Sequence, residues 1–296
     1  MRSGRTGRDM QRLLFATDFS ERSDRALRRA VLLARQSGAS LEIVHVIDDD
    51  RPRRIVEQEA TEARHLVDGL ARSLREADGL VCETRIVLAD PFAGIVQTVK
   101  STKPDLLIIG PHRRQLLRDI FVGTTAERTI RSAGCPVLMV NGPPVGPYRH
   151  ILMTTDLSDA SRNALDRFAA LDFGQLPALS LLHVYGAPAL RLAMSDTMVD
   201  EDRDAYLREV RGEVQAELGA LAAQLAGPRA QLILRHDETS VAHEILRAAD
   251  DLEADLVVVS TQGRNALTRI LLGSVTDEVL TAAPVDVLAI PPVRAD

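Results

Sequence analysis

The sequence is poor in the residues that mark aromatic-rich binding proteins and disulfide-bonded domains. Only 3% of its 296 residues are aromatic and none is tryptophan, so aliphatic side chains must fill the core. We therefore do not expect an aromatic surface that stacks on sugars or RNA bases. Two cysteines, Cys82 and Cys135, are too few for a disulfide framework or a four-cysteine zinc site.

Long apolar runs and an excess of basic residues are also missing. Runs such as 106–109 and 256–259 fall far short of the roughly 18 residues of a membrane span. The basic start of the chain precedes no long apolar segment, so we expect residues 1–10 to be a flexible tail, not a secretory signal. The net charge of −6 provides no broad basic face for duplex DNA. We predict a cytoplasmic protein that binds neither nucleic acid nor membrane.

What the sequence does contain is an internal repeat. Segment 12–20, Arg-Leu-Leu-Phe-Ala-Thr-Asp-Phe-Ser, matches segment 150–158, His-Ile-Leu-Met-Thr-Thr-Asp-Leu-Ser. Later in each half, Asp105–Gly110 matches Asp255–Ser260 in the same way. A repeat on this scale indicates two copies of one folded unit.

The length and the linker agree with two domains. At about 150 residues per domain the chain should hold two, and its 45% hydrophobic content suffices for two cores. We expect a first domain over 11–142 and a second over 148–296. The turn-forming segment 141–147 joins them, and residues 186–205 hold most of the extra length of the second copy.

Strand-like and helix-like patterns alternate within each half. In the first, the apolar run Leu13–Thr17 precedes a helix that Ser20 can cap and Gly38 can end. Pro91 favours the start of another helix, and 106–109 is apolar on both strand faces. This alternation predicts an α/β fold with a parallel sheet covered on both sides.

The residues that follow the first, second and fourth strands are candidates for binding, because α/β sheets bind ligands beyond the carboxyl ends of their strands. In the first half they are Thr17, Asp18, Val46, Gly110, His112 and Arg113. In the second half they are Thr155, Asp156, Val184, Ser260, Gln262 and Gly263.

A glycine and a hydroxyl residue then precede a predicted helix in each half. The segments are Gly123-Thr124-Thr125 and Gly273-Ser274-Val275. A helix N-terminus attracts phosphate through free N–H groups and a partial positive charge, and glycine lets the backbone approach it. The hydroxyl of Thr124 or Ser274 adds a donor or reaches a phosphate-bound Mg²⁺.

A purely structural interpretation exists for each of these residues. Asp18 and Asp156 could cap the first helix of each half or bond the adjacent loop. His45 and His183 could serve packing, and a glycine with a hydroxyl residue often forms a turn and an N-cap. The recurrence of the whole set in both halves favours a binding site.

At this point the sequence resembles a known family. The pattern Gly-x₂-Gly-x₉-Gly-Ser/Thr after the fourth strand is similar to the ATP-binding signature of universal stress proteins. The opening Thr-Asp-x-Ser segment and Ala133–Val140 also look like that family. Because the resemblance covers nearly the whole chain twice, it indicates a tandem universal stress protein.

The resemblance implies two repeated doubly wound domains, each a five-stranded parallel sheet of order 3-2-1-4-5 with helices on both faces. It implies binding of ATP or ADP, with or without Mg²⁺. It also implies an intramolecular pseudo-dimer through the fifth strands, for which Val137–Val140 and Val285–Ile290 are the candidates. Pairing of two chains into a homodimer is left open.

Neither half carries the full signature. Arg113 replaces the second glycine in the first half, whereas Ser260 replaces the first glycine in the second half. Since serine is the smaller change, the second half is the better predicted ATP site. There Thr155, Asp156 and Val184 would surround adenine and ribose. The phosphates would meet Gly263, Gly273, Ser274 and Val275. The matching, weaker site would use Thr17, Asp18, Val46, Gly110, His112, Gly123, Thr124 and Thr125.

Catalytic motifs are absent from the sequence. It has no P-loop, no dinucleotide-binding glycine motif and no nucleophile elbow, and lysine is scarce near the proposed phosphate loops. We therefore predict a nucleotide-binding stress or signalling protein with at most slow hydrolysis. The alternatives are a scaffold that has lost nucleotide binding and, less favoured, an adenylylating enzyme.

Overall fold

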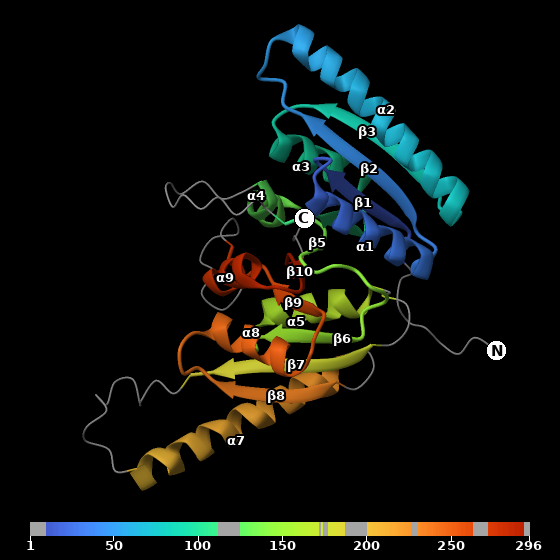
Figure 1. Ribbon diagram of the computed structural model, residues 1–296. Coiled ribbons are helices and arrows are strands. Elements are labelled where there is room, and N and C mark those ends of the chain that lie inside the picture. Colours follow the sequence, from blue (N-terminus) through green and yellow to red (C-terminus); the bar gives the residue numbers. More distant parts are fainter. Residues whose placement is uncertain are drawn as a thin grey trace, which may run out of the picture.

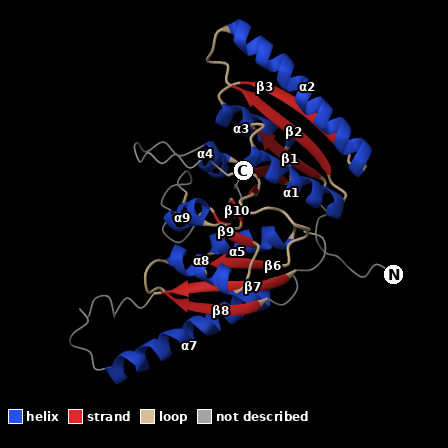
Figure 2. Ribbon diagram, in the orientation of Figure 1, coloured by secondary structure: helices blue, strands red, loops and turns tan. Residues whose placement is uncertain are grey.

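Ten strands form one sheet through the molecule, with helices on both faces (Figures 1 and 2). The computed structural model describes residues 10–111, 125–171, 173, 177–186, 200–225, 230–262 and 272–292, and only the backbone of 200–204. Within that part the strand order is β3-β2-β1-β4-β5-β10-β9-β6-β7-β8. The predicted α/β fold is confirmed, and the two expected sheets are halves of a single sheet.

Strands and helices alternate along both halves. The first half contains β1 (Arg12–Thr17), α1 (Glu21–Ser37), β2 (Ser40–Ile47), α2 (Arg53–Asp78), β3 (Cys82–Leu88), α3 (Pro91–Thr102), β4 (Leu106–Ile109), α4 (Thr125–Ser132) and β5 (Val137–Met139). The second contains β6 (His150–Thr155), α5 (Asp159–Ala169), β7 (Ala178–Tyr185), α7 (Asp200–Gln224), β8 (Gln231–His236), α8 (Val241–Asp251), β9 (Leu256–Ser260), α9 (Ser274–Ala282) and β10 (Asp286–Ile290). Most of the predicted insertion, 186–205, lies outside the described residues.

Local sequence rules explain where the helices begin and end. Ser20 caps α1 by accepting a hydrogen bond from the Ser23 N–H, and Gly38 ends the helix with a φ of 75°. Pro91 opens α3, which Asp90 caps through the Ala93 N–H. The expected N-cap, C-cap and proline start therefore stand where the sequence pattern puts them.

The two halves meet where β5 and β10 pair. This contact is antiparallel, whereas all other strand neighbours run parallel. Val137 lies opposite Ala289, and Met139 lies opposite Val287. Both strands are buried, so each covers the hydrogen-bonding edge that the other would otherwise expose.

The cores on the two faces of the sheet are each continuous across both halves. One cluster joins Phe15 of β1 to Met153 of β6, together with residues of α1, α2, α5 and α7. The other joins Leu14 to Leu152, together with residues of α3, α4, α8 and α9. The boundary between the sequence repeats is therefore not a boundary in the packing.

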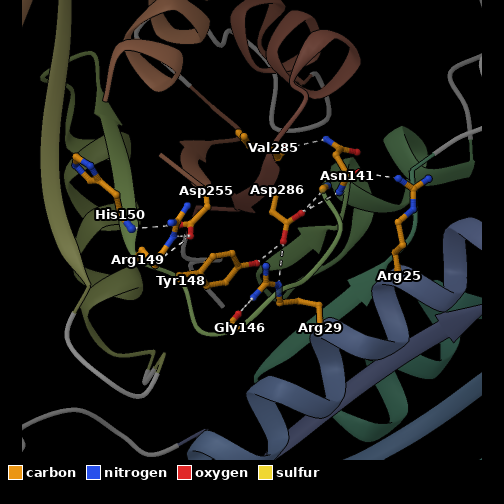
Figure 3. A network of polar contacts seen from close by, with 11 residues as sticks. Arg25, Arg29, Asn141, Gly146, Tyr148, Arg149, His150, Asp255, Val285 and Asp286 are labelled. Atoms are coloured by element: carbon orange, nitrogen blue, oxygen red, sulfur yellow. Dashed lines mark hydrogen bonds and ion pairs between the residues drawn. The ribbon is translucent and has the colours of Figure 1, made fainter. Parts of the chain in front are cut away.

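A buried polar network holds this boundary together (Figure 3). Asp286 of β10 is 1% exposed and lies 3.1 Å from Nε of Arg29 in α1. The hydroxyl of Tyr148 donates to its carboxylate at 2.7 Å, and the backbone N–H groups of Asn141 and Gly142 donate at 3.0 Å. Burial raises the pKa of Asp286, although Arg29 and these donors favour its charged form.

Candidate functional site

The turn that follows β1 is strained and held by side chains. Phe19 has a φ of 57°, a left-handed conformation that bulky residues rarely adopt. The Oγ1 atom of Thr17 accepts a hydrogen bond from the Phe19 N–H at 3.0 Å. Oδ1 of Asp18 accepts from the Ser20 N–H at 3.0 Å and from its hydroxyl. Asp18 thus bonds the adjacent loop, as its structural interpretation expected.

The second half repeats this turn after β6. Leu157 has a φ of 63°, and its N–H donates to Oγ1 of Thr155 at 3.0 Å. Asp156 accepts from the N–H and hydroxyl of Ser158 in the same way. Strain of this kind persists only where the surroundings enforce it, and it concentrates at functional sites.

A histidine on each second strand supports the end of the first strand. Nδ1 of His45 lies 2.8 Å from the carbonyl oxygen of Thr17, and Nδ1 of His183 lies 2.7 Å from that of Thr155. Because a carbonyl only accepts, each Nδ1 carries the proton. Both rings are buried, and Phe19 packs on His45 with 4.3 Å between ring centroids.

A cavity of about 400 Å³ opens at the carboxyl ends of β1, β2 and β4. Its lining residues are Ala16, Thr17, Asp18, Ser20, Arg22, Ser23, Val44, Val46, Pro91, Ile95, Ile109, Gly110, Pro111, Thr125, Ala126 and Thr129. The predicted residues Thr17, Asp18, Val46, Gly110 and Thr125 therefore meet in one place. His112, Arg113, Gly123 and Thr124 lie outside the described residues.

The cavity combines apolar walls with a polar, positively polarised region. Val44, Val46 and Ile95 provide apolar surface, and the first turns of α1, α3 and α4 all contribute lining residues. Helix N-termini carry partial positive charge, so three of them at one cavity favour an anionic group. Burial pushes the pKa of Asp18 upward, but hydrogen bonds from Ser20 and Ser23 and the charge of Arg22 bring it below its ordinary value.

Arg22 and Thr129 are among the lining residues that the sequence did not predict for the site. Nη2 of Arg22 lies 3.7 Å from Oδ2 of Asp18, and their spacing of one helical turn was the available signal. Oγ1 of Thr129 is buried and has no hydrogen-bond partner among the residues that the structure describes. No sequence signal distinguishes Thr129 from any other threonine on a helix.

Packing around position 110 leaves little room for a side chain, which explains the glycine there. A Cβ atom at this position would lie 3.0 Å from the Arg22 carbonyl oxygen and 3.2 Å from the Ser23 backbone nitrogen. The expected room for a ribose is thus also the room that the first turn of α1 needs. The second half has Ser260 here, whose hydroxyl donates to the Gln262 carbonyl at 2.7 Å.

The second half brings its predicted residues to one edge of the sheet. Because β7, β6 and β9 are adjacent parallel strands, Val184, Thr155 and Ser260 lie near the same edge, and Asp156 follows directly. Gly273 caps α9, Ser274 is its first residue, and Val275 and Val184 both pack against the same core cluster. Gln262 lies just after β9, and Gly263 falls outside the described residues.

The described residues hold no group of three or more His, Cys, Asp or Glu side chains placed to bind a metal. Among the helices within the described ranges, none combines the length and apolar character that crossing a bilayer requires.

Comparison with known proteins places both halves in one family. The model of the universal stress protein family matches residues 10–141 and again 147–291. A universal stress protein of Mycobacterium tuberculosis is 28% identical over 93% of this chain and 95% of its own length. Universal stress protein E of Salmonella typhi is 24% identical over 95% and 94%.

A solved structure shows the same fold over the full length. A universal stress protein from Archaeoglobus fulgidus superposes with a TM-score of 0.67 at 18% identity, covering 95% of this chain and 98% of that one. The two family matches, one in each half, together span nearly all of the sequence. The chain belongs to the universal stress protein family.

Proposed function

We propose that this chain is a stress-response module that binds an adenine nucleotide, ATP or ADP, at the strand ends of each half. The observation that carries the proposal is the cavity beyond β1, β2 and β4, where apolar walls meet three helix N-termini. A purine fits apolar walls such as Val46 and Ile95, and phosphates fit the helix N-termini. A cytoplasmic location and at most slow hydrolysis stay predictions of the sequence.

In this proposal the two sites use equivalent residues. Thr17, Asp18 and Val46 would surround adenine and ribose, with Gly110 by the ribose. His112, Gly123, Thr124 and Thr125 would meet the phosphates. The second site uses Thr155, Asp156, Val184, Ser260, Gln262, Gly263, Gly273, Ser274 and Val275. Mg²⁺ would bind mainly through phosphate oxygens and water, as it usually does with nucleotides, with Ser274 or Thr124 as an added oxygen.

We propose that the second half binds ATP more tightly. Its departure from the family signature, Ser260, adds a small hydroxyl that bonds within its own loop. The departure in the first half is Arg113, a bulky residue at the motif position where glycine would let the backbone approach phosphate. Gly273 directly before α9 allows the close approach in the second half, and Gly123 is the matching glycine of the first half, so the ranking depends on Ser260 and Arg113.

We also propose that the β5–β10 contact joins the two halves into an intramolecular pseudo-dimer. The antiparallel register and the matched strand order on either side support this interpretation. Association of two whole chains is a separate question, which molecular-mass measurements in solution would answer.

Site-specific fluorescence can test the proposal, because the chain has no tryptophan. Phe19→Trp and Leu157→Trp each place one reporter on the strained turn of one half. ATP should change both signals in a saturable manner, with the lower Kd at Leu157→Trp. Val145→Trp, at a linker residue that is 90% exposed, is the control that should not respond.

The outcomes separate the alternatives. Silence of both reporters at millimolar ATP, with no nucleotide in mass spectra of the purified chain, would favour the nucleotide-free scaffold. Stoichiometric formation of AMP with a carboxylic acid would favour the adenylylating enzyme. Equal affinities, or tighter binding in the first half, would contradict the proposed ranking.

A further inference from the structure

We propose that Arg22 is an anion-binding residue that gives the first-half site its own selectivity for phosphorylated ligands. The inference rests on the proposed nucleotide binding and goes beyond it. It assigns the phosphate contact to a helix α1 side chain, outside the glycine loop that the family signature describes.

The guanidinium of Arg22 has unused hydrogen-bonding capacity. Its ion pair with Asp18 is loose, at 3.7 Å, and among the described residues it makes no hydrogen bond. Its side chain is 31% exposed and lines the cavity. A guanidinium offers five N–H donors in a planar fork that matches phosphate oxygens. These donors are therefore available to a ligand.

The surroundings of Arg22 favour an anionic ligand over a neutral one. Arg22 lies in the first turn of α1, and Thr125 in the first turn of α4 lines the same cavity. An anion here gains from two helix N-termini and from one full charge. The negative charge of Asp18 disfavours an anion here, but the Asp18 carboxylate already accepts two hydrogen bonds from Ser20. A phosphate can replace Asp18 as the partner of Arg22 while Asp18 remains bonded to the turn.

A second lining residue also lacks a hydrogen-bond partner, which a ligand could supply. Within the described ranges the hydroxyl of Thr129 makes no hydrogen bond, although the side chain is fully buried. A buried hydroxyl without a partner is costly, so native structures rarely leave one unsatisfied without a reason. Its position at the cavity wall gives that reason if a polar group of the ligand bonds it.

The second half lacks both features. The segment Glu21-Arg22-Ser23 corresponds to Asp159-Ala160-Ser161, and Thr129 corresponds to Val279. The cation is therefore specific to the first half, where Arg113 interrupts the glycine signature. Arg22 thus provides a phosphate contact in the half that has Arg113 at the second glycine position of the family signature.

The test uses the full chain with the Phe19→Trp reporter. Adenosine, AMP, ADP and ATP are titrated with and without Arg22→Ala. We expect Arg22→Ala to weaken binding of all three nucleotides about tenfold or more, as the loss of a charge-assisted bond implies, and to leave adenosine unchanged. Arg22→Lys should recover part of the loss, since it restores the charge without the fork.

The matched variant is Ala160→Arg with the Leu157→Trp reporter, which should tighten nucleotide binding in the second half. Unchanged affinities at Leu157→Trp in the Arg22→Ala chain would show that the chain is still folded. Equal loss for adenosine and AMP, or no loss at all, would overturn the role of Arg22 and leave nucleotide binding intact. If the Phe19→Trp chain with Arg22 intact bound no nucleotide in its first half, the proposed function of that half would be overturned, and the inference with it.

Discussion

The two halves keep the same turn after their first strand and differ in residues around the candidate site. The left-handed residue, the aspartate that bonds the following serine and the histidine on the second strand recur in both. The positions that differ include Arg22 against Ala160, Gly110 against Ser260 and Thr129 against Val279. The residues that hold the turn are thus the same in both halves, whereas several other cavity-lining residues of the first half have a different counterpart in the second.

The contact between the halves shows the same kind of asymmetry. Asp286 of the second half accepts hydrogen bonds from Arg29, Tyr148 and the linker backbone. The corresponding residue of the first half is Pro136. A molecule with twofold-related strands therefore has its buried ion pair on one side of the contact only.

Replacing the buried carboxylate should have the largest effect. Asp286→Ala leaves Arg29 buried without its charged partner, so we expect a loss of about 3–5 kcal/mol in the free energy of unfolding. Pro136→Ala, the same change at the corresponding position, should cost no more than about 1 kcal/mol. Urea denaturation followed by circular dichroism measures both values. Similar losses for the two variants would remove the asymmetry.

A pair of exchanges at two corresponding buried positions should have a smaller effect on stability. Thr129→Val makes the first half resemble the second and removes an unpartnered buried hydroxyl, so the ligand-free chain should gain about 1 kcal/mol. Val279→Thr should lose a similar amount, because valine and threonine have similar shapes and helix propensities. Thermal unfolding without nucleotide tests both. Destabilisation by Thr129→Val would indicate that the hydroxyl has a partner.

The thiols should show the smallest effect, because they barely react in the native state. Both lie in the first half, and burial raises the pKa of Cys82 to about 11 and that of Cys135 to about 12. Alkylation at pH 8 should therefore be slow until urea unfolds the chain. Because folding raises these pKa values, their contribution to stability is present below about pH 9 and lost as the pH rises towards 11–12.

Mass spectrometry of the alkylated peptides distinguishes the two thiols. Cys135 lies just before β5, the strand that pairs with β10, whereas Cys82 begins β3 at the far end of the sheet. Rapid labelling of Cys135 alone in the native chain would show that the contact between the halves opens more readily than the first half unfolds.

Local rules predicted much of the fold, and long-range contacts explain most of what was missed. Ser20, Gly38 and Pro91 act within a few residues, so their roles can be read from neighbouring sequence. Asp286 stands in an apolar strand segment, and its partner Arg29 is distant in the chain. Nothing local in the sequence links the two residues.

The candidate site divides in the same way. Strand ends were predictable because parallel strands bring their carboxyl ends to a common edge, which is how Thr17, Val46 and Gly110 were selected. Thr129 joins the cavity only through the packing of α4 against α3, and Arg22 only through the direction of its side chain. The sequence thus predicts which edge of the sheet holds the candidate site, whereas tertiary packing determines which other residues line the cavity.

The placement of both paired strands in one chain has a consequence for stoichiometry. Two different halves made as separate chains could combine into two self-pairs and one mixed pair. A self-pair of first halves would bring Arg29 against Pro136, which offers no carboxylate. Joining the halves through residues 141–147 yields only the mixed combination, so every molecule carries one half with Arg22 and one with Ala160. The linker thereby ensures a constant one-to-one composition of two unlike halves at any expression level.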